Sequence, residues 1–121
     1  MLRSLFNRSA HIQTRTQIRG ISARELKERL DAGERPLLLD VRSSMEFQHD
    51  GHIPGSHLLP LPALGSRLDE LPKDQTIVCV CRSGNRSRFA CEQLAAAGFN
   101  DIINLNGGIL NWRNMGRLSR K

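Results

Sequence analysis

A cysteine that follows a short apolar run is the residue of this sequence best placed for chemistry. Residues 76–80 are rich in β-branched side chains and lack polar alternation, which is typical of a strand buried on both faces of a parallel sheet. Cys81 comes next, followed by small and basic residues and then by a helical pattern over residues 87–97. A loop between such a strand and the unpaired N–H groups of a helix start forms a cradle for an anion.

The cradle predicts an ionised thiol. Helix N-termini and nearby Arg lower the pKa of a cysteine from about 8.5 into the range of roughly 3.5 to 7.5. We therefore predict that Cys81 is a nucleophile rather than an inert buried thiol. The predicted cradle consists of Arg82, Ser83, Gly84, Asn85, Arg86 and Ser87. Arg82 and Arg86 are the candidates for attracting and orienting an anionic substrate, because Arg binds sulfur or phosphorus oxyanions in a bidentate manner.

Four segments at family-like spacing resemble the rhodanese family. They are Leu39-Asp40-Val41-Arg42, Gly51-His52-Ile53-Pro54-Gly55-Ser56, the loop 81–87, and Asn106-Gly107-Gly108-Ile109-Leu110-Asn111-Trp112. The resemblance covers most of residues 21–112 and implies a single rhodanese-like α/β domain with three layers, a central parallel sheet flanked by helices. It also implies that Cys81 carries a sulfane sulfur as a persulfide, and that Asp40, Arg42, Glu46 and His52 are structural supports of the loops near the site.

The expected reaction is sulfur transfer in two covalent steps. Cys81 attacks the outer sulfur of a donor such as thiosulfate, expels sulfite and holds the sulfur until a thiophilic acceptor, cyanide or a thiol, takes it. Backbone N–H groups of residues 82–87 would hold the terminal sulfur as an oxyanion hole holds oxygen. The expected enzyme is a thiosulfate sulfurtransferase, and this chemistry needs no cofactor.

Two alternatives stay open. A phosphatase or arsenate reductase also uses a cysteine before a helix, but its signature has five residues between Cys and Arg, whereas four separate Cys81 from Arg86. The shorter loop suits one sulfur atom better than a phosphoryl group. The other alternative is a sulfur-relay or regulatory module that docks a protein donor or acceptor and has little turnover on small donors.

The remaining cysteines and histidines are weaker candidates. Cys79 shares a strand face with Cys81, and Cys91 lies on the helix near Leu94, so we expect both to be packed thiols. His49, His52 and His57 have no matching ligand cluster elsewhere, and we expect no metal site.

The predicted elements alternate between helices and strands, as in a doubly wound α/β domain. Capping boxes at Ser22/Glu25 and Ser43/Glu46 each open a helix, and Gly33 ends the first of them. The other expected elements are strands at residues 36–41, 56–59 and 101–105, a helix from Pro62 to Leu71, a helix end at Gly98, a terminal helix with Trp112 on its apolar side, and an edge strand near residues 17–21.

The positive charge belongs to the two ends of the chain. Of the 18 basic residues, eight lie in residues 1–19 and 113–121, where there is no acidic residue, so the part between them has a small acidic excess. We therefore expect no nucleic-acid groove. The domain is predicted at residues 20–115, between a flexible basic extension (1–19) and a basic tail (116–121).

Location is predicted from cysteine content and from the amino-terminal composition. Three cysteines without a secretory signal indicate a reducing compartment, the cytoplasm. The alternative is the mitochondrial matrix, if residues 1–19 act as a transit peptide. No apolar run approaches the roughly 18 residues that cross a bilayer.

Overall fold

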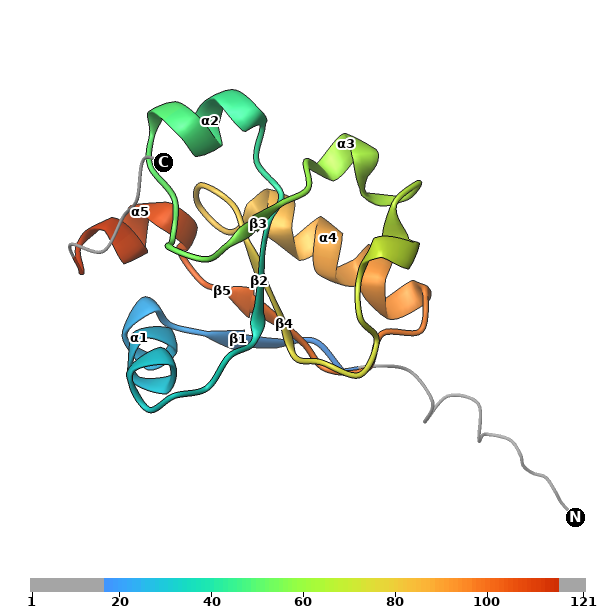
Figure 1. Ribbon diagram of the computed structural model, residues 1–121, viewed down its shortest axis with the longest axis horizontal. Coiled ribbons are helices and arrows are strands. Elements are labelled where there is room, and N and C mark those ends of the chain that lie inside the picture. Colours follow the sequence, from blue (N-terminus) through green and yellow to red (C-terminus); the bar gives the residue numbers. More distant parts are fainter. Residues whose placement is uncertain (1–16, 116–121) are drawn as a thin grey trace, which may run out of the picture.

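A parallel sheet lies between two helical layers in the computed structural model, which describes residues 17–115 (Figure 1). The described part contains five strands in the order β1-β5-β4-β2-β3, and every neighbouring pair is parallel. The strands are β1 (Arg19–Ile21), β2 (Leu37–Asp40), β3 (His57–Leu58), β4 (Ile77–Val80) and β5 (Ile102–Leu105). The helices are α1 (Ala23–Asp31), α2 (Ser44–His49), α3 (Leu61–Leu64), the 3-10 turn η2 (Leu68–Glu70), α4 (Asn85–Ala96) and α5 (Gly108–Arg113).

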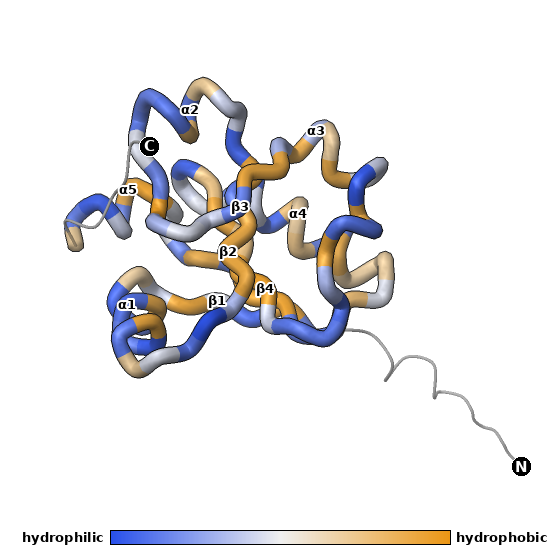
Figure 2. Tube along the Cα trace, viewed as in Figure 1, coloured by the Kyte–Doolittle hydropathy of each residue, from blue (hydrophilic) through white to orange (hydrophobic). Residues whose placement is uncertain are grey.

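Alternate residues of the buried strands face opposite layers, because side chains alternate along a strand. On one face, Leu39, Ile77 and Cys79 pack with residues of α3 and α4. On the other, Val78 and Ile103 pack with residues of α1 and α5. Figure 2 shows the resulting apolar colour along β2 and β4. The sheet therefore has an apolar core on both faces, as predicted for strands without polar alternation.

Most predicted elements are present with shifted ends. The strand predicted at residues 17–21 is β1, which begins at Arg19, the last residue of the predicted extension, and pairs with β5. The helix after the cysteine loop begins at Asn85, two residues earlier than predicted, and Gly98 follows its end with a φ of 94°. None of the helices in residues 17–115 is long and apolar enough to cross a membrane. Residues 1–16 and 116–121, where most of the predicted extension and the tail lie, are outside the described residues.

Two local predictions were wrong. The helix predicted from Pro62 to Leu71 is divided into α3 and η2, because Gly65 and Ser66 are poor helix formers and Ser66 bonds back to the carbonyl of Ala63 at 3.2 Å. At α1 only half of the capping box forms. Ser22 accepts from the N–H of Glu25, but the Glu25 carboxylate pairs with Arg29 one turn along the helix (2.9 Å).

Candidate active site

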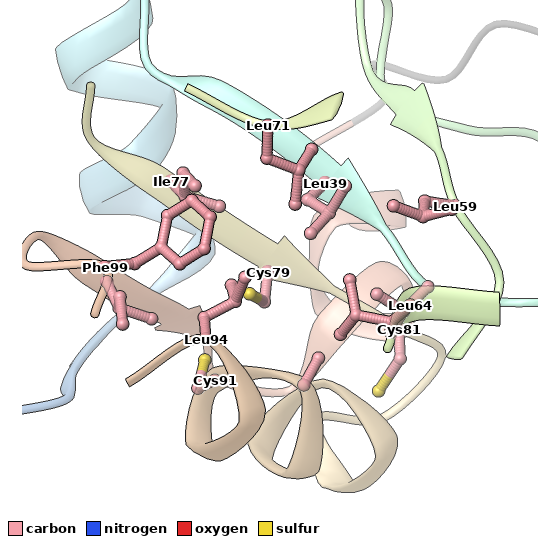
Figure 3. Packing of buried hydrophobic residues seen from close by; sticks show 13 residues of the cluster. Leu39, Leu59, Leu64, Leu71, Ile77, Cys79, Cys81, Cys91, Leu94 and Phe99 are labelled. Atoms are coloured by element: carbon pink, nitrogen blue, oxygen red, sulfur yellow. The ribbon is translucent and has the colours of Figure 1, made fainter. Parts of the chain in front are cut away.

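Cys81 lies at the carboxyl end of β4, where the chain turns into α4. Figure 3 shows its side chain beside the first turn of α4, apart from the other two cysteines. Only 1% of the residue is exposed, so the sulfur forms the floor of the loop rather than its rim. Gly84 is the N-cap of α4 and has a φ of 107°, a left-handed conformation that glycine adopts without strain. This turn aims the N–H groups of the helix start back at the sulfur.

Hydrogen bonds to the sulfur favour its ionised form. The N–H of Gly84 donates to Cys81 Sγ at 3.0 Å. Burial is the largest single influence and would raise the pKa of Cys81, but hydrogen bonds from the hydroxyl and backbone N–H of Ser87 and from the N–H groups of Gly84 and Ser83 together bring the pKa below its ordinary value. The loop thus has the geometry of an anion cradle around a sulfur that ionises more readily than a free thiol.

Asn104 is a buried polar residue of the site that sequence reasoning missed. Its Oδ1 accepts from the Ser87 hydroxyl at 2.5 Å, and its Nδ2 donates to the carbonyl of Gly84 at 3.3 Å. The single hydroxyl proton of Ser87 thus has two acceptors within reach, Asn104 Oδ1 and the sulfur of Cys81. An amide in the otherwise apolar strand 102–105 was the signal in the sequence that could have identified it.

The start of α5 donates hydrogen bonds to the backbone of the cysteine loop. The N–H of Ile109 donates to the carbonyl of Cys81 at 2.9 Å, and the N–H of Leu110 donates to the carbonyl of Arg82 at 3.1 Å. This approach requires Gly108, because a Cβ there would lie 2.3 Å from the Cys81 carbonyl oxygen. The Gly107-Gly108 pair therefore lets two segments separated by more than twenty residues share backbone hydrogen bonds.

The two predicted arginines differ in their surroundings. Arg86 donates from both terminal nitrogens to the carboxylate of Glu46 at 2.8 and 2.7 Å, which joins α4 to α2. Arg82 is exposed, and within residues 17–115 no carboxylate forms an ion pair with it. Of the two, Arg82 is the one whose charge is not balanced by a carboxylate of its own.

The predicted supporting residues form two further local networks. Asp40 at the end of β2 is bound by the guanidinium of Arg42, with both residues buried, and Arg42 also donates to the carbonyl of Gly51 at 2.9 Å. His52 bonds through Nδ1 to the carbonyl of Phe47 at 2.9 Å and stacks on the Phe47 ring at 3.7 Å. These contacts fix the segments that frame the carboxyl edge of the sheet.

The other cysteines lie in the core between β4 and α4. A hydrogen bond with Cys91, together with burial, raises the pKa of Cys79 well above its ordinary value, and both residues are fully buried. Residues 17–115 contain no cluster of three or more His, Cys, Asp or Glu side chains that could hold a metal ion. Within those residues, His49, His52 and His57 do not belong to such a cluster.

Known proteins resemble this chain over nearly all of the described residues. The Rhodanese-like domain model matches residues 22–115. A sulfurtransferase of Allochromatium vinosum is 40% identical over 96 residues, which are 79% of this chain and 89% of that protein. The probable adenylyltransferase/sulfurtransferase MoeZ of Mycobacterium tuberculosis is 40% identical over 76% of this chain, and the match spans only 24% of MoeZ.

One further relative and one solved structure are also similar to this chain. The putative sulfur carrier protein YrkF of Bacillus subtilis is 35% identical over 76% of this chain, and the match spans 49% of YrkF. The crystal structure of a rhodanese-related protein from Thermoplasma volcanium has a TM-score of 0.76 and 32% identity, and the alignment covers 85% of this chain and 99% of that one. With its fold, the family model and its relatives all in agreement, the chain belongs to the rhodanese-like sulfurtransferase family.

Proposed function

We propose that this protein moves a sulfane sulfur from a donor such as thiosulfate to a thiophilic acceptor through a persulfide on Cys81. The single observation that carries the proposal is the hydrogen-bonded sulfur of Cys81, which accepts from the Gly84 N–H at 3.0 Å in a loop that lowers its pKa. A thiolate is the nucleophilic form of cysteine, and amides already directed at the sulfur are positioned for a second sulfur bound to it.

In the first half of the reaction, the donor transfers its outer sulfur to Cys81. The Cys81 thiolate attacks the outer sulfur of thiosulfate, a new S–S bond forms, and the bond to the sulfite sulfur breaks with its electron pair. Sulfite leaves and the Cys81 persulfide anion remains, held by the N–H groups of the loop. In the second half, cyanide or a thiol takes the terminal sulfur and restores the Cys81 thiolate. No cofactor enters either half.

The test combines turnover with mass detection. Thiosulfate and cyanide are supplied and thiocyanate is measured, while intact-mass analysis follows the addition of one sulfur atom after thiosulfate alone. We expect the added sulfur to map to the peptide that contains Cys81 and to be absent from Cys81→Ser, which should keep the fold. Sulfur transfer retained by Cys81→Ser would refute the assignment.

A sulfur relay with a protein partner is the second candidate. Two exposed large apolar side chains favour it: Met45 is next to Glu46, and Phe89 is one turn beyond Arg86 on α4. The resemblance to a putative sulfur carrier protein also supports a partner protein. Loading of Cys81 without turnover on cyanide would favour this relay over the enzyme. A parallel assay for hydrolysis of a phosphate ester tests the phosphatase alternative, against which the spacing of Cys81 and Arg86 argues.

A further inference from the structure

The ion pair between Glu46 and Arg86 is fixed from both sides. Glu46 Oε1 accepts from the Ser43 N–H and hydroxyl, each at 3.1 Å, as part of the capping box of α2. The guanidinium of Arg86 meets both oxygens of the same carboxylate at 2.8 and 2.7 Å. Because the capping box orients the carboxylate before Arg86 binds it, little side-chain entropy remains to be lost in forming the pair.

This ion pair neutralises the positive charge of Arg86, which a small dianionic substrate would need at the loop. A substrate oxyanion at the loop would have to compete with the Glu46 carboxylate for the same two donors of Arg86. The hydrogen bond with Arg86, the strongest influence on the carboxyl group, lowers the pKa of Glu46 to about 2, so the competitor is charged at every working pH. The two buried charges at this edge, Asp40 and Arg42, neutralise each other, so Arg82 and the loop amides are left to attract an anion.

We infer that Glu46 is a specificity-determining residue, which acts by neutralising Arg86 and so disfavours dianionic oxyanion donors such as thiosulfate relative to donors that are themselves persulfides. The inference rests on the proposed function and names the class of donor for the same cysteine. A persulfide R–S–SH has no oxyanion group to place on Arg86. It needs only a nucleophile and donors near its terminal sulfur, which the loop around Cys81 provides.

The persulfide step balances without a further reactant. The Cys81 thiolate attacks the terminal sulfur of R–S–SH, a new S–S bond forms, and the old S–S bond breaks with its electron pair on the R sulfur. The products are Cys81–S–SH and the thiolate R–S⁻, with the proton retained on the transferred sulfur. The carboxylate of Glu46 takes no part in this step, so its charge should influence this donor little.

The experiment compares two donors in single-turnover loading. Thiosulfate and the persulfide of 2-mercaptoethanol are each mixed with the full chain, and the rate of sulfur addition to Cys81 is followed by mass. Glu46→Gln keeps an acceptor for the capping box, since Gln also serves at this position, and removes the negative charge. We expect loading from thiosulfate to become about fivefold faster, the scale of a partly exposed ion pair, and loading from the persulfide to change less than twofold.

Matched variants separate specificity from simple support of the loop. Glu25 occupies the same third position of α1 and also pairs with an arginine, Arg29 at 2.9 Å, so Glu25→Gln should leave both rates unchanged. Arg86→Gln should slow thiosulfate more than the persulfide, because it leaves Glu46 unpaired. The double variant Glu46→Gln/Arg86→Gln replaces an ion pair of zero net charge by two uncharged side chains. The ratio of its loading rates from thiosulfate and from the persulfide should therefore return towards the parent value.

The possible results distinguish the two proposals. If both donors slow together in Glu46→Gln while Cys81 still loads, Glu46 only supports the loop, and the inference fails while the sulfur-transfer proposal stands. If the parent chain adds no sulfur from either donor, both fail. Should Glu46→Gln not fold, as judged by thermal unfolding, Arg86→Gln still gives the donor ratio, and equal slowing of both donors in that variant would overturn the inference.

Discussion

At the scale of single residues, the ionisation of a thiol depends on which groups surround its sulfur. Cys81 is 1% exposed and Cys79 is fully buried, so exposure does not explain why one should ionise and the other should not. The difference lies in their neighbours. Cys79 meets the thiol of Cys91, whereas Cys81 faces N–H groups of residues 83, 84 and 87 and the Ser87 hydroxyl. We therefore propose that position relative to the start of α4 makes Cys81 the reactive cysteine of the two.

Removing the Ser87 hydroxyl should raise the pKa of Cys81. In Ser87→Ala the backbone N–H groups remain, but the hydroxyl, whose proton lies within reach of both the sulfur and Asn104 Oδ1, is lost. A hydrogen bond of about 1 kcal/mol corresponds to about a fivefold slower alkylation at a pH below the pKa. The rate of iodoacetamide labelling against pH measures this. Ser83→Ala is the control, because Ser83 contributes its backbone N–H, and an equal slowing in that variant would contradict the role given to the hydroxyl.

At the scale of elements, three segments distant in sequence hold the cysteine loop. The helix α2 holds Arg86 through Glu46, β5 holds Ser87 and Gly84 through Asn104, and α5 holds the carbonyls of residues 81 and 82. Each contact is made at the carboxyl edge of the sheet, where ligands bind in parallel α/β folds. The loop is thus shaped by its neighbours as much as by its own residues.

Acid should weaken the contact between α2 and α4. The folded pKa of Glu46 is about 2 against an ordinary 4.5, so its contribution to stability is complete above pH 4.5 and is lost as the pH falls towards 2. The Arg86 side chain is 41% exposed, so solvent screening limits the contribution to about 1 kcal/mol or less. Chemical unfolding at stepped pH should show a shallower acid loss in Glu46→Gln and in Arg86→Gln than in the parent. Identical acid slopes in all three would contradict this account of the pair.

A side chain at position 108 should displace the loop from α5. In Gly108→Ala the new Cβ would meet the carbonyl oxygens of Cys81 and Arg82 at 2.3 and 2.6 Å, in a residue whose φ is 56°. We expect a loss of roughly 2 kcal/mol or more in the free energy of unfolding, with slower labelling of Cys81.

The control for that variant is Gly33→Ala. Gly33 also has a positive φ, 98°, but nothing lies within 4 Å of the added atom, so this variant reports backbone strain alone. Chemical unfolding and Cys81 labelling of the two variants should therefore differ. Equal losses of stability, with unchanged labelling in both, would mean that the approach of α5 to the loop is not what requires glycine at 108.

At the scale of the whole molecule, features that follow from local residue patterns were predictable from the sequence. Contacts between residues far apart in the sequence were not. Apolar runs without alternation predicted buried parallel strands, and the family-like segments predicted the three-layer fold, which is confirmed. The contact of Glu46 with Arg86 joins residues 40 positions apart, and Asn104 reaches Ser87 from 17 positions away. No local pattern encodes such distances, because they follow from the packing of complete elements. The division between α3 and η2 is local, and Gly65-Ser66 marked it in the sequence.

The positions of the three cysteines predict how their thiols respond to unfolding. Cys79 and Cys91 lie between β4 and α4, and Cys81 lies at the edge of the sheet. A short pulse of alkylator at neutral pH should therefore modify one cysteine in the native protein and three in denaturant. Mass analysis of each sample gives the count. Two or three modified cysteines in the native protein would show that the core layer between β4 and α4 opens more readily than its burial indicates.

The most direct test of the central claim is the pH dependence of labelling at Cys81, read by mapping the modified peptide at each pH. The account predicts that a single cysteine, Cys81, reacts in the native protein, with a rate that reaches half its plateau at a pH below the ordinary pKa of a free thiol. Modification at Cys79 or Cys91 in the native state, or a Cys81 midpoint at or above that of a free thiol, would contradict it.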